Sequence, residues 1–184
     1  MMVASVAGCH PAVFANTVKK FVKSGFTLLL AEDDEADVML FTRLLEESSQ
    51  KAAVRVRLAV TRNGEDALAY LKGEGEFSDR TKHPFPDLVV TDLKMPRLNG
   101  LGVLAWMKEH LKYQGVPSIM LSGSAEECDV AEAHRLGVNT FFQKPTTLYE
   151  FRELVDQIVC YWSHNQRPVM RQLARGIKAG VPGI

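Results

Sequence analysis

The sequence predicts an α/β fold in which a parallel sheet carries helices on both faces. From Phe26 onward, short apolar runs alternate with amphipathic stretches, which is the pattern of a doubly wound sheet. The runs FTLLLA, DLVVTD, SIMLS and NTFFQK are almost continuously apolar, as expected of parallel strands that are buried on both faces. About five strand-helix units fit into the 184 residues, so a single globular core is expected.

The remaining elements follow from local patterns. In the run VRVRLAVT, apolar residues alternate with Arg55 and Arg57, which predicts a strand with one wetter face at the edge of the sheet. Asp34 and Ser124 are expected to cap helices, and the segment 73–86, rich in glycine and charge, to form an exposed loop. Apolar residues recur at helical spacing within residues 34–49, 100–111, 124–137 and 146–162.

Charge is distributed unevenly along the chain, although the formal net charge is zero. Residues 26–156 hold all 22 acidic residues but only 15 of the 22 basic ones, a net charge of −7, which argues against a nucleic-acid surface on this part. The strand-helix pattern divides the chain into an N-terminal extension (1–25), a central domain (26–163) and a basic C-terminal tail (164–184). We expect both extensions to be loosely docked, in preference to forming membrane or partner sites.

The sequence also indicates where the protein works. Cys9, Cys128 and Cys160 are too few and too scattered for a disulfide framework or a zinc site, which suggests a reducing compartment. There is no apolar run of about 18 residues, so no membrane span is expected. The N-terminal run MMVASVAGCHPAVFA lacks the positive charge that opens a secretory signal. We therefore expect a cytoplasmic protein.

Chemically active side chains follow the predicted strands at their carboxyl ends, where open parallel sheets bind ligands. Glu32 and Asp33 follow the first strand, Asp92 ends the third, Ser122 ends the fourth, and Lys144 follows the fifth. Neighbouring carboxylates repel one another unless a cation lies between them, and oxygen ligands favour Mg²⁺ or Mn²⁺. A lysine and a hydroxyl beside such a cation are suited to a phosphate group, so Asp92 is a candidate nucleophile for phosphoryl transfer.

The motifs LLLAEDD, VVTDLKMPRLNG, IMLSGSAEE and FFQKP resemble those of the response-regulator receiver family of two-component signalling, over roughly residues 26–163. The resemblance implies a flavodoxin-like five-stranded sheet in the order 2-1-3-4-5. It further implies that Asp92 is the phosphoacceptor, with Lys144 beside the phosphoryl group. Glu32, Asp33, Asp92 and the backbone carbonyl of Lys94 would bind Mg²⁺. Ser122 and Phe141 would be the switch residues.

The same resemblance implies the partners. A sensor histidine kinase or a phosphotransfer protein would phosphorylate Asp92. The long loop around Phe77 and the Glu32-Asp33 pair resemble the phytochrome-associated, single-domain subgroup, which makes a phytochrome one candidate kinase. About twenty residues follow Trp162, too few for a DNA-binding domain, so we expect output through a downstream protein partner.

Two other functions and one assembly are compatible with the residues. A haloacid-dehalogenase-type phosphohydrolase would carry a second acid two residues after its nucleophile, where this chain has Lys94. A receiver-like binding module would work without phosphorylation, which the intact acids and lysine disfavour. A homodimer through the last predicted helix and the neighbouring fourth helix is expected, because the apolar residues of the last helix exceed what one side of the sheet can cover and leave an exposed patch. The alternative is that the basic C-terminal tail folds back over these residues. These residues are Phe151, Val159, Tyr161 and Trp162.

Overall fold

The computed structural model describes residues 25–110 and 112–164. Five parallel strands alternate with helices along these residues. The strands are β1 (Phe26–Ala31), β2 (Val56–Thr61), β3 (Leu88–Asp92), β4 (Ser118–Ser122) and β5 (Thr140–Gln143). They form one sheet in the order β2-β1-β3-β4-β5, and every neighbouring pair is parallel. The predicted fold class and strand order are therefore confirmed.

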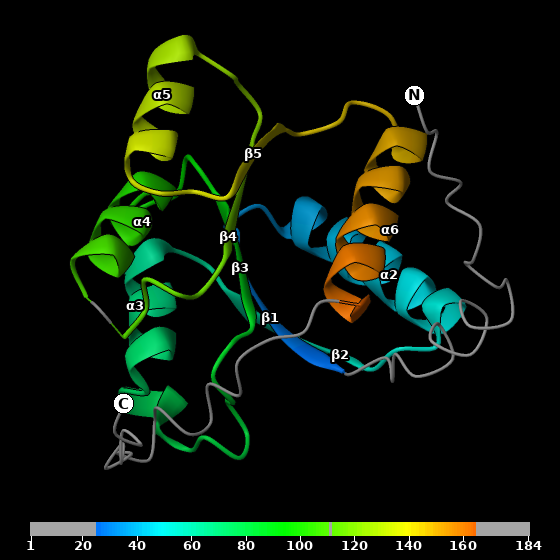
Figure 1. Ribbon diagram of the computed structural model, residues 1–184, viewed down its shortest axis with the longest axis horizontal. Helices are drawn as coiled ribbons and strands as arrows, with labels where there is room; N and C mark the ends of the chain where they lie inside the picture. Colours follow the sequence, from blue (N-terminus) through cyan, green and yellow to red (C-terminus); the bar gives the residue numbers. More distant parts are fainter. Residues whose placement is uncertain (1–24, 111, 165–184) are drawn as a thin grey trace, which may run out of the picture.

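Helices cover both faces of this sheet. Helices α2 and α6 lie on one face, and α3, α4 and α5 lie on the other (Figure 1). Among the described helices, none is long and apolar enough to cross a membrane. The expected extensions fall outside the described residues, except for Gly25 and His164. The helices are α2 (Glu35–Ala52), α3 (Gly64–Lys72), the 3₁₀ helix η1 (Gly75–Ser78), α4 (Gly100–Glu109), α5 (Glu127–Arg135) and α6 (Leu148–His164).

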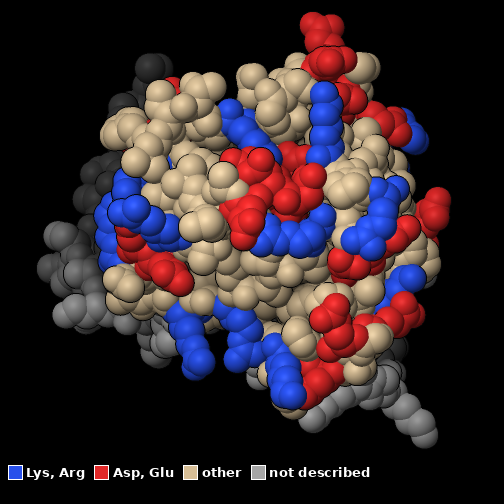
Figure 2. Space-filling model, turned by 180° about the vertical axis from the view of Figure 1, so that it is seen from behind, with Lys and Arg blue, Asp and Glu red and all other residues tan. Residues whose placement is uncertain are grey.

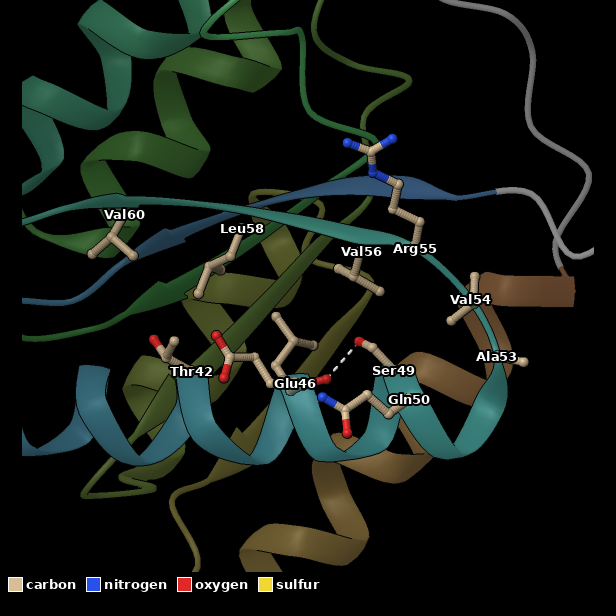
Figure 3. A pocket seen from close by; sticks show the side chains of 11 residues that line it. Thr42, Glu46, Ser49, Gln50, Ala53, Val54, Arg55, Val56, Leu58 and Val60 are labelled. Carbon is tan, nitrogen blue, oxygen red and sulfur yellow. Dashed lines mark hydrogen bonds between the residues drawn. The ribbon is translucent and has the colours of Figure 1, made fainter.

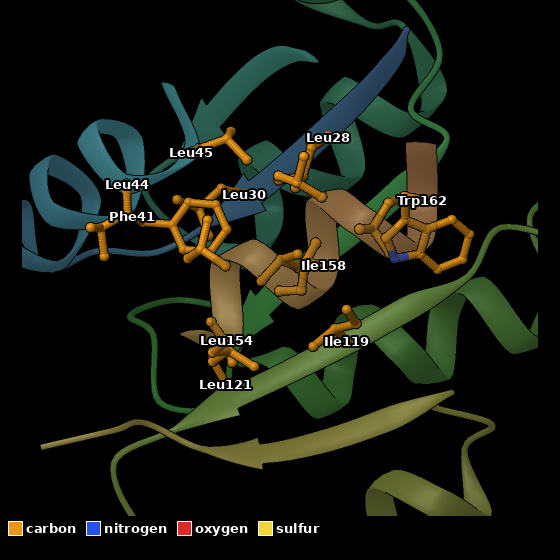
Figure 4. Close-up of a cluster of buried hydrophobic side chains, with 14 of the residues drawn as sticks. Leu28, Leu30, Phe41, Leu44, Leu45, Ile119, Leu121, Leu154, Ile158 and Trp162 are labelled. Carbon is orange, nitrogen blue, oxygen red and sulfur yellow. The ribbon is translucent and has the colours of Figure 1, made fainter. Parts of the chain in front are cut away.

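Strand β1 supplies apolar side chains to both faces of the sheet. Leu28 and Leu30 pack into the cluster beneath α2 and α6 (Figure 4). Leu29 packs with residues of α3 and α4 on the opposite face. This arrangement follows from the alternation of side chains along a strand. Burial on both faces explains why β1, β3 and β4 consist mainly of apolar residues.

The last helix packs into the core and presents no apolar patch of the predicted kind. Phe151, Val159 and Trp162 are buried in the cluster that α2 and α6 form against the sheet. Figure 4 shows Trp162 in this cluster. The ring of Phe151 meets that of Phe41 from α2 edge-on, with centroids 6.2 Å apart. Of the four residues expected to form the patch, Tyr161 is the one that is exposed, at 65%. The predicted patch is wrong because α2 helps to cover these side chains, and the homodimer that rested on it loses its support.

Strand β2 lies at the edge of the sheet, as its alternating sequence predicted. Its Val56, Leu58 and Val60 are half-buried, and an open groove separates them from the second half of α2 (Figure 3). None of the residues predicted for the functional site lines this groove. The chemistry predicted at the strand ends therefore has to be sought elsewhere on the molecule.

The segment 73–86 is more firmly attached than the exposed loop that its composition predicted. The guanidinium group of Arg80 donates hydrogen bonds to the carbonyl oxygens of Tyr70 and Leu71, both at 2.7 Å. The hydroxyl of Tyr70 in turn donates to the carbonyl of Pro84 at 2.8 Å. Arg80 thus supplies donors to the last turn of α3, whose carbonyls lack partners within the helix.

Replacing Arg80 by Met should lower the free energy of unfolding by about 1–3 kcal/mol, because carbonyl groups would lose charged donors. The affected carbonyls belong to Tyr70, Leu71 and His83. Lys82→Met is the matched control, since Lys82 makes one exposed ion pair at 3.7 Å, and its effect should stay below about 0.5 kcal/mol. Urea denaturation followed by circular dichroism measures both. Equal losses in the two variants would contradict an anchoring role for Arg80.

Candidate functional site

The carboxyl ends of the strands bring the predicted site residues to one edge of the sheet. Asp92 is the last residue of β3 and Ser122 the last of β4, while Glu32 follows β1 directly and Lys144 follows β5 directly. Strands β1 and β3 are neighbours, so the acids after β1 lie beside Asp92. On the face seen in Figure 2, acidic side chains gather near the middle, and lysine and arginine side chains surround them.

The ammonium group of Lys144 joins three carboxylates from three different elements. Its Nζ lies 2.7 Å from Oε2 of Glu32, 2.7 Å from Oδ2 of Asp37 and 2.9 Å from Oδ1 of Asp92. Burial by itself would lower the pKa of Lys144, but the hydrogen bonds to Asp37, Asp92 and Glu32 outweigh it and raise that pKa. Lys144 therefore stays charged at every physiological pH.

Asp37 is the member of this group that sequence reasoning missed. It lies in the first turn of α2, three residues after Asp34, whose side chain accepts hydrogen bonds from the backbone N–H groups of Ala36 and Asp37. The prediction that Asp34 caps this helix is confirmed. The available sequence signal for Asp37 is its short distance along the chain from the end of β1. The first turn of a helix that begins beside a strand end stays near that edge of the sheet.

Asp92 is held by the backbone of the loop that follows it. Its side chain is buried, and Oδ2 accepts a hydrogen bond of 2.5 Å from the backbone N–H of Lys94. Gly100 approaches so closely that a Cβ atom there would lie 2.2 Å from the Asp92 carbonyl oxygen. Asn99 caps α4 by accepting from the N–H of Gly102 at 2.9 Å. The Asn99-Gly100 pair thus starts a helix directly against the aspartate.

Glu32, Asp33 and Asp92 form a group that fits a hard divalent cation. Each offers one carboxylate oxygen, and these oxygens all lie within 4.8 Å of one another. Burial raises the pKa of Glu32, and the hydrogen bond from Lys144 opposes this shift. A bound cation would favour the charged form of all three groups. Oxygen donors without sulfur or imidazole suit Mg²⁺ or Mn²⁺.

The remaining predicted residues differ in how deeply they are buried. Ser122 is buried, and its Oγ accepts a hydrogen bond of 3.3 Å from the N–H of Ser124. Phe141 is half-buried and packs against the cluster between β4 and α5, while the side chain of Lys94 is exposed. Ser124 does not cap α5, which begins after Glu126, and its own Oγ is buried without a hydrogen-bond partner.

A response regulator receiver domain is the class of protein that this strand order and this edge define. The family model of that description matches residues 28–156. The chain belongs to the response regulator receiver domain family.

Individual relatives are similar over most of the chain. The response regulator Rcp1 of Synechocystis sp. is 31% identical over 135 residues, which are 73% of this chain and 87% of Rcp1. The crystal structure of the phosphorylated cyanobacterial phytochrome response regulator RcpA matches with a TM-score of 0.67 and 31% identity, over 75% of this chain and 94% of that one. The Mn²⁺-bound form of Rcp1 matches with a TM-score of 0.67 and 29% identity, over 77% and 97% of the two chains.

Mg²⁺ should raise the melting temperature, and Asp33→Ala should remove most of this rise, because a ligand stabilises the state that binds it. Asp33 is exposed and makes no ion pair with Lys144 in the described structure, so its loss leaves that cluster intact. Without Mg²⁺ the variant should melt no lower than the wild type, since one repelling carboxylate is gone.

Thermal melting at increasing Mg²⁺ concentration measures this effect, with Glu35→Ala as the control for charge. Glu35 lies in the first turn of α2, outside the cation group. An Mg²⁺ response in Asp33→Ala that matches the wild type would rule out Asp33 as a ligand.

Proposed function

We propose that the protein is a phosphoacceptor of two-component signalling, in which Asp92 receives a phosphoryl group from a sensor histidine kinase or a phosphotransfer protein. The observation that carries the proposal is the position of Asp92. Its Oδ1 lies 2.9 Å from the ammonium group of Lys144. Asp92 also belongs, with Glu32 and Asp33, to the three-acid group at the candidate cation site. One carboxylate thus lies between a fixed cation and a candidate metal site, which suits a group that must accept a phosphoryl anion.

The transfer is a displacement at phosphorus. An oxygen of Asp92 forms a bond to phosphorus while the phosphorus–nitrogen bond of a phosphohistidine breaks, and the bonding electrons leave with the histidine nitrogen. Lys144 donates hydrogen bonds to the phosphoryl oxygens without giving up a proton. Mg²⁺ or Mn²⁺, held by Glu32, Asp33, Asp92 and the carbonyl of Lys94, would supply further positive charge.

We propose that Ser122 and Phe141 transmit the effect of phosphorylation at Asp92 to the surface of the protein. The hydroxyl of Ser122 would turn from the N–H of Ser124 toward a phosphoryl oxygen, since a charged acceptor makes the stronger hydrogen bond. Phe141 packs in the same cluster as residues of α4 and the segment after α5, so a shift of β4 reaches this side of the molecule. The changed surface would then be recognised by a downstream protein partner.

The relatives support a choice of kinase. RcpA is described as a cyanobacterial phytochrome response regulator, which makes a phytochrome the first candidate for the sensor of this chain. Exposed apolar side chains near the site offer a contact surface: Met39 in α2 is 67% exposed, and Tyr149 in the first turn of α6 is 68% exposed. The cytoplasmic location inferred from the cysteines stays a prediction.

Two alternatives make different predictions. A phosphohydrolase of the haloacid-dehalogenase type would need a general acid at position 94, where the side chain is an exposed lysine. A binding module would gain no phosphate under any condition. Acetyl phosphate with Mg²⁺, followed by intact mass, separates all three: one stable added phosphoryl group favours the phosphoacceptor, and turnover of excess phosphate ester favours the hydrolase.

Asp92→Asn should abolish the mass gain of one phosphoryl group, because the amide keeps the shape of the side chain but is not a nucleophile. Omission of Mg²⁺ should abolish it in the wild type. Asp129→Asn, in α5 and outside the three-acid group, is the matched control and should gain phosphate normally. A phosphorylated Asp92→Asn protein would mean that another residue is the acceptor.

Lys94→Asn should shorten the half-life of the phosphorylated form several-fold, corresponding to about 1 kcal/mol of barrier. The long lysine side chain begins two residues after Asp92 and can occupy the approach of the attacking water, whereas asparagine leaves that path open. Lys94→Met keeps the length without the charge and should retain slow loss. Phosphate release at equal Mg²⁺ measures the three proteins, and unchanged or slower loss in Lys94→Asn would show that the lysine does not shield the group.

A further inference from the structure

Asp37 is the carboxylate around Lys144 that lies outside the candidate cation site. Glu32 and Asp92, which also contact the ammonium group, belong to the three-acid group, and Asp37 does not. We propose that Asp37 is a positioning residue, which keeps Lys144 aimed at Asp92 while a cation and a phosphoryl group engage the other carboxylates. The proposal rests on the proposed function and names a residue that this function did not require.

Lys144 donates hydrogen bonds to Glu32 and Asp37, both at 2.7 Å, and forms an ion pair with Asp92 at 2.9 Å. An ammonium group has three N–H donors, and Glu32, Asp37 and Asp92 each lie within 2.9 Å of the nitrogen. A phosphoryl group on Asp92 would therefore compete with these carboxylates for the N–H donors of Lys144. With a cation bound, Glu32 and Asp92 would interact with both the cation and Lys144, whereas Asp37 would interact with Lys144.

The place of Asp37 is fixed by the start of its helix. The N–H of Asp37 donates to Oδ1 of Asp34 at 3.0 Å, and that of Ala36 donates to the same oxygen at 2.8 Å. The side chain of Asp37 is 35% exposed and that of Lys144 is 17% exposed. The contact between them is thus partly buried, and the carboxylate projects from a helix turn that the Asp34 cap holds in place.

Positioning matters because lysine has a long, flexible side chain. A free lysine loses much rotamer entropy when it is held in one direction, and every contact that fixes it beforehand lowers this cost at the moment of reaction. With acetyl phosphate as the donor, an oxygen of Asp92 bonds to phosphorus, the bond from phosphorus to the acetyl oxygen breaks, and acetate leaves with the electron pair. Lys144 must already face the phosphoryl oxygens for its charge to help.

Two substitutions of Asp37 separate position from charge. Asp37→Asn removes the charge but keeps an oxygen acceptor for Lys144, while Asp37→Ala removes both. At saturating Mg²⁺, Asp37→Ala should take phosphate from acetyl phosphate about five-fold more slowly than the wild type, and Asp37→Asn should keep more than about half of the rate. Glu35→Ala, an acid of the same helix turn, is the matched control and should react like the wild type.

Mg²⁺ affinity, measured by thermal melting without any phosphate donor, gives a second and independent readout. Asp37→Asn and Asp37→Ala lose the same negative charge near the cation site, so both should bind Mg²⁺ more weakly, and to a similar extent. A residue that merely stabilised the helix would not produce equal Mg²⁺ affinities together with unequal rates. Circular dichroism establishes that each variant is folded.

The outcomes distinguish this inference from the proposed function. Equal rates in the wild type and Asp37→Ala, or equal slowing in Asp37→Asn and Asp37→Ala, would overturn the positioning role alone. A wild-type protein that gains no phosphate would overturn the proposed function, and the positioning role with it. Slowing confined to Asp37→Ala supports both.

Discussion

The partly buried ammonium group of Lys144 is the constraint on which the rest of the site depends. A buried charge is costly unless it is paired, and here Glu32, Asp37 and Asp92 surround it within 2.9 Å. These partners come from the loop after β1, from the start of α2 and from the end of β3. One cation thus fixes the relative positions of elements that are distant in sequence. Each acid, in turn, is tolerated near the others because Lys144 offsets their mutual repulsion.

The strand order explains which residue type stands at which strand end. Strands β1 and β3 are adjacent, so short acids after them already meet. Strand β5 is separated from β3 by β4, which places it about 10 Å away at the usual strand spacing. A long side chain such as Lys144 spans that distance, whereas the intervening β4 needs only the short hydroxyl of Ser122. The length of the side chain at each of these strand ends therefore matches the distance of its strand from Asp92.

Sequence reasoning succeeded for most local patterns and for the strand ends, failed for the Ser124 cap, and missed individual side-chain contacts between elements. Strands buried on both faces, the edge position of β2 and the Asp34 cap all follow from residue patterns within a single element. Asp37 and Arg80 were missed, because the role of each depends on a partner in another element: Lys144 for Asp37, and the end of α3 for Arg80. The expected patch on α6 failed for the same reason, since the burial of Trp162 depends on packing that no local pattern records.

The two loops beside Asp92 are held unequally, and this asymmetry bears on how a change there could spread. After β3, the N–H of Gly64 donates to the carbonyl of Leu98 at 3.0 Å, and Arg97 pairs with Asp66 at 3.5 Å, so this loop is tied to the start of α3. After β4, α5 begins without a side-chain cap, and the Oγ of Ser124 is buried without a partner. The phosphoryl group proposed for Asp92 would therefore lie between two different loops. The loop after β3 is bonded to the start of α3, and the loop after β4 leads into a helix without a side-chain cap. The loop after β4 follows directly on Ser122, the proposed switch residue.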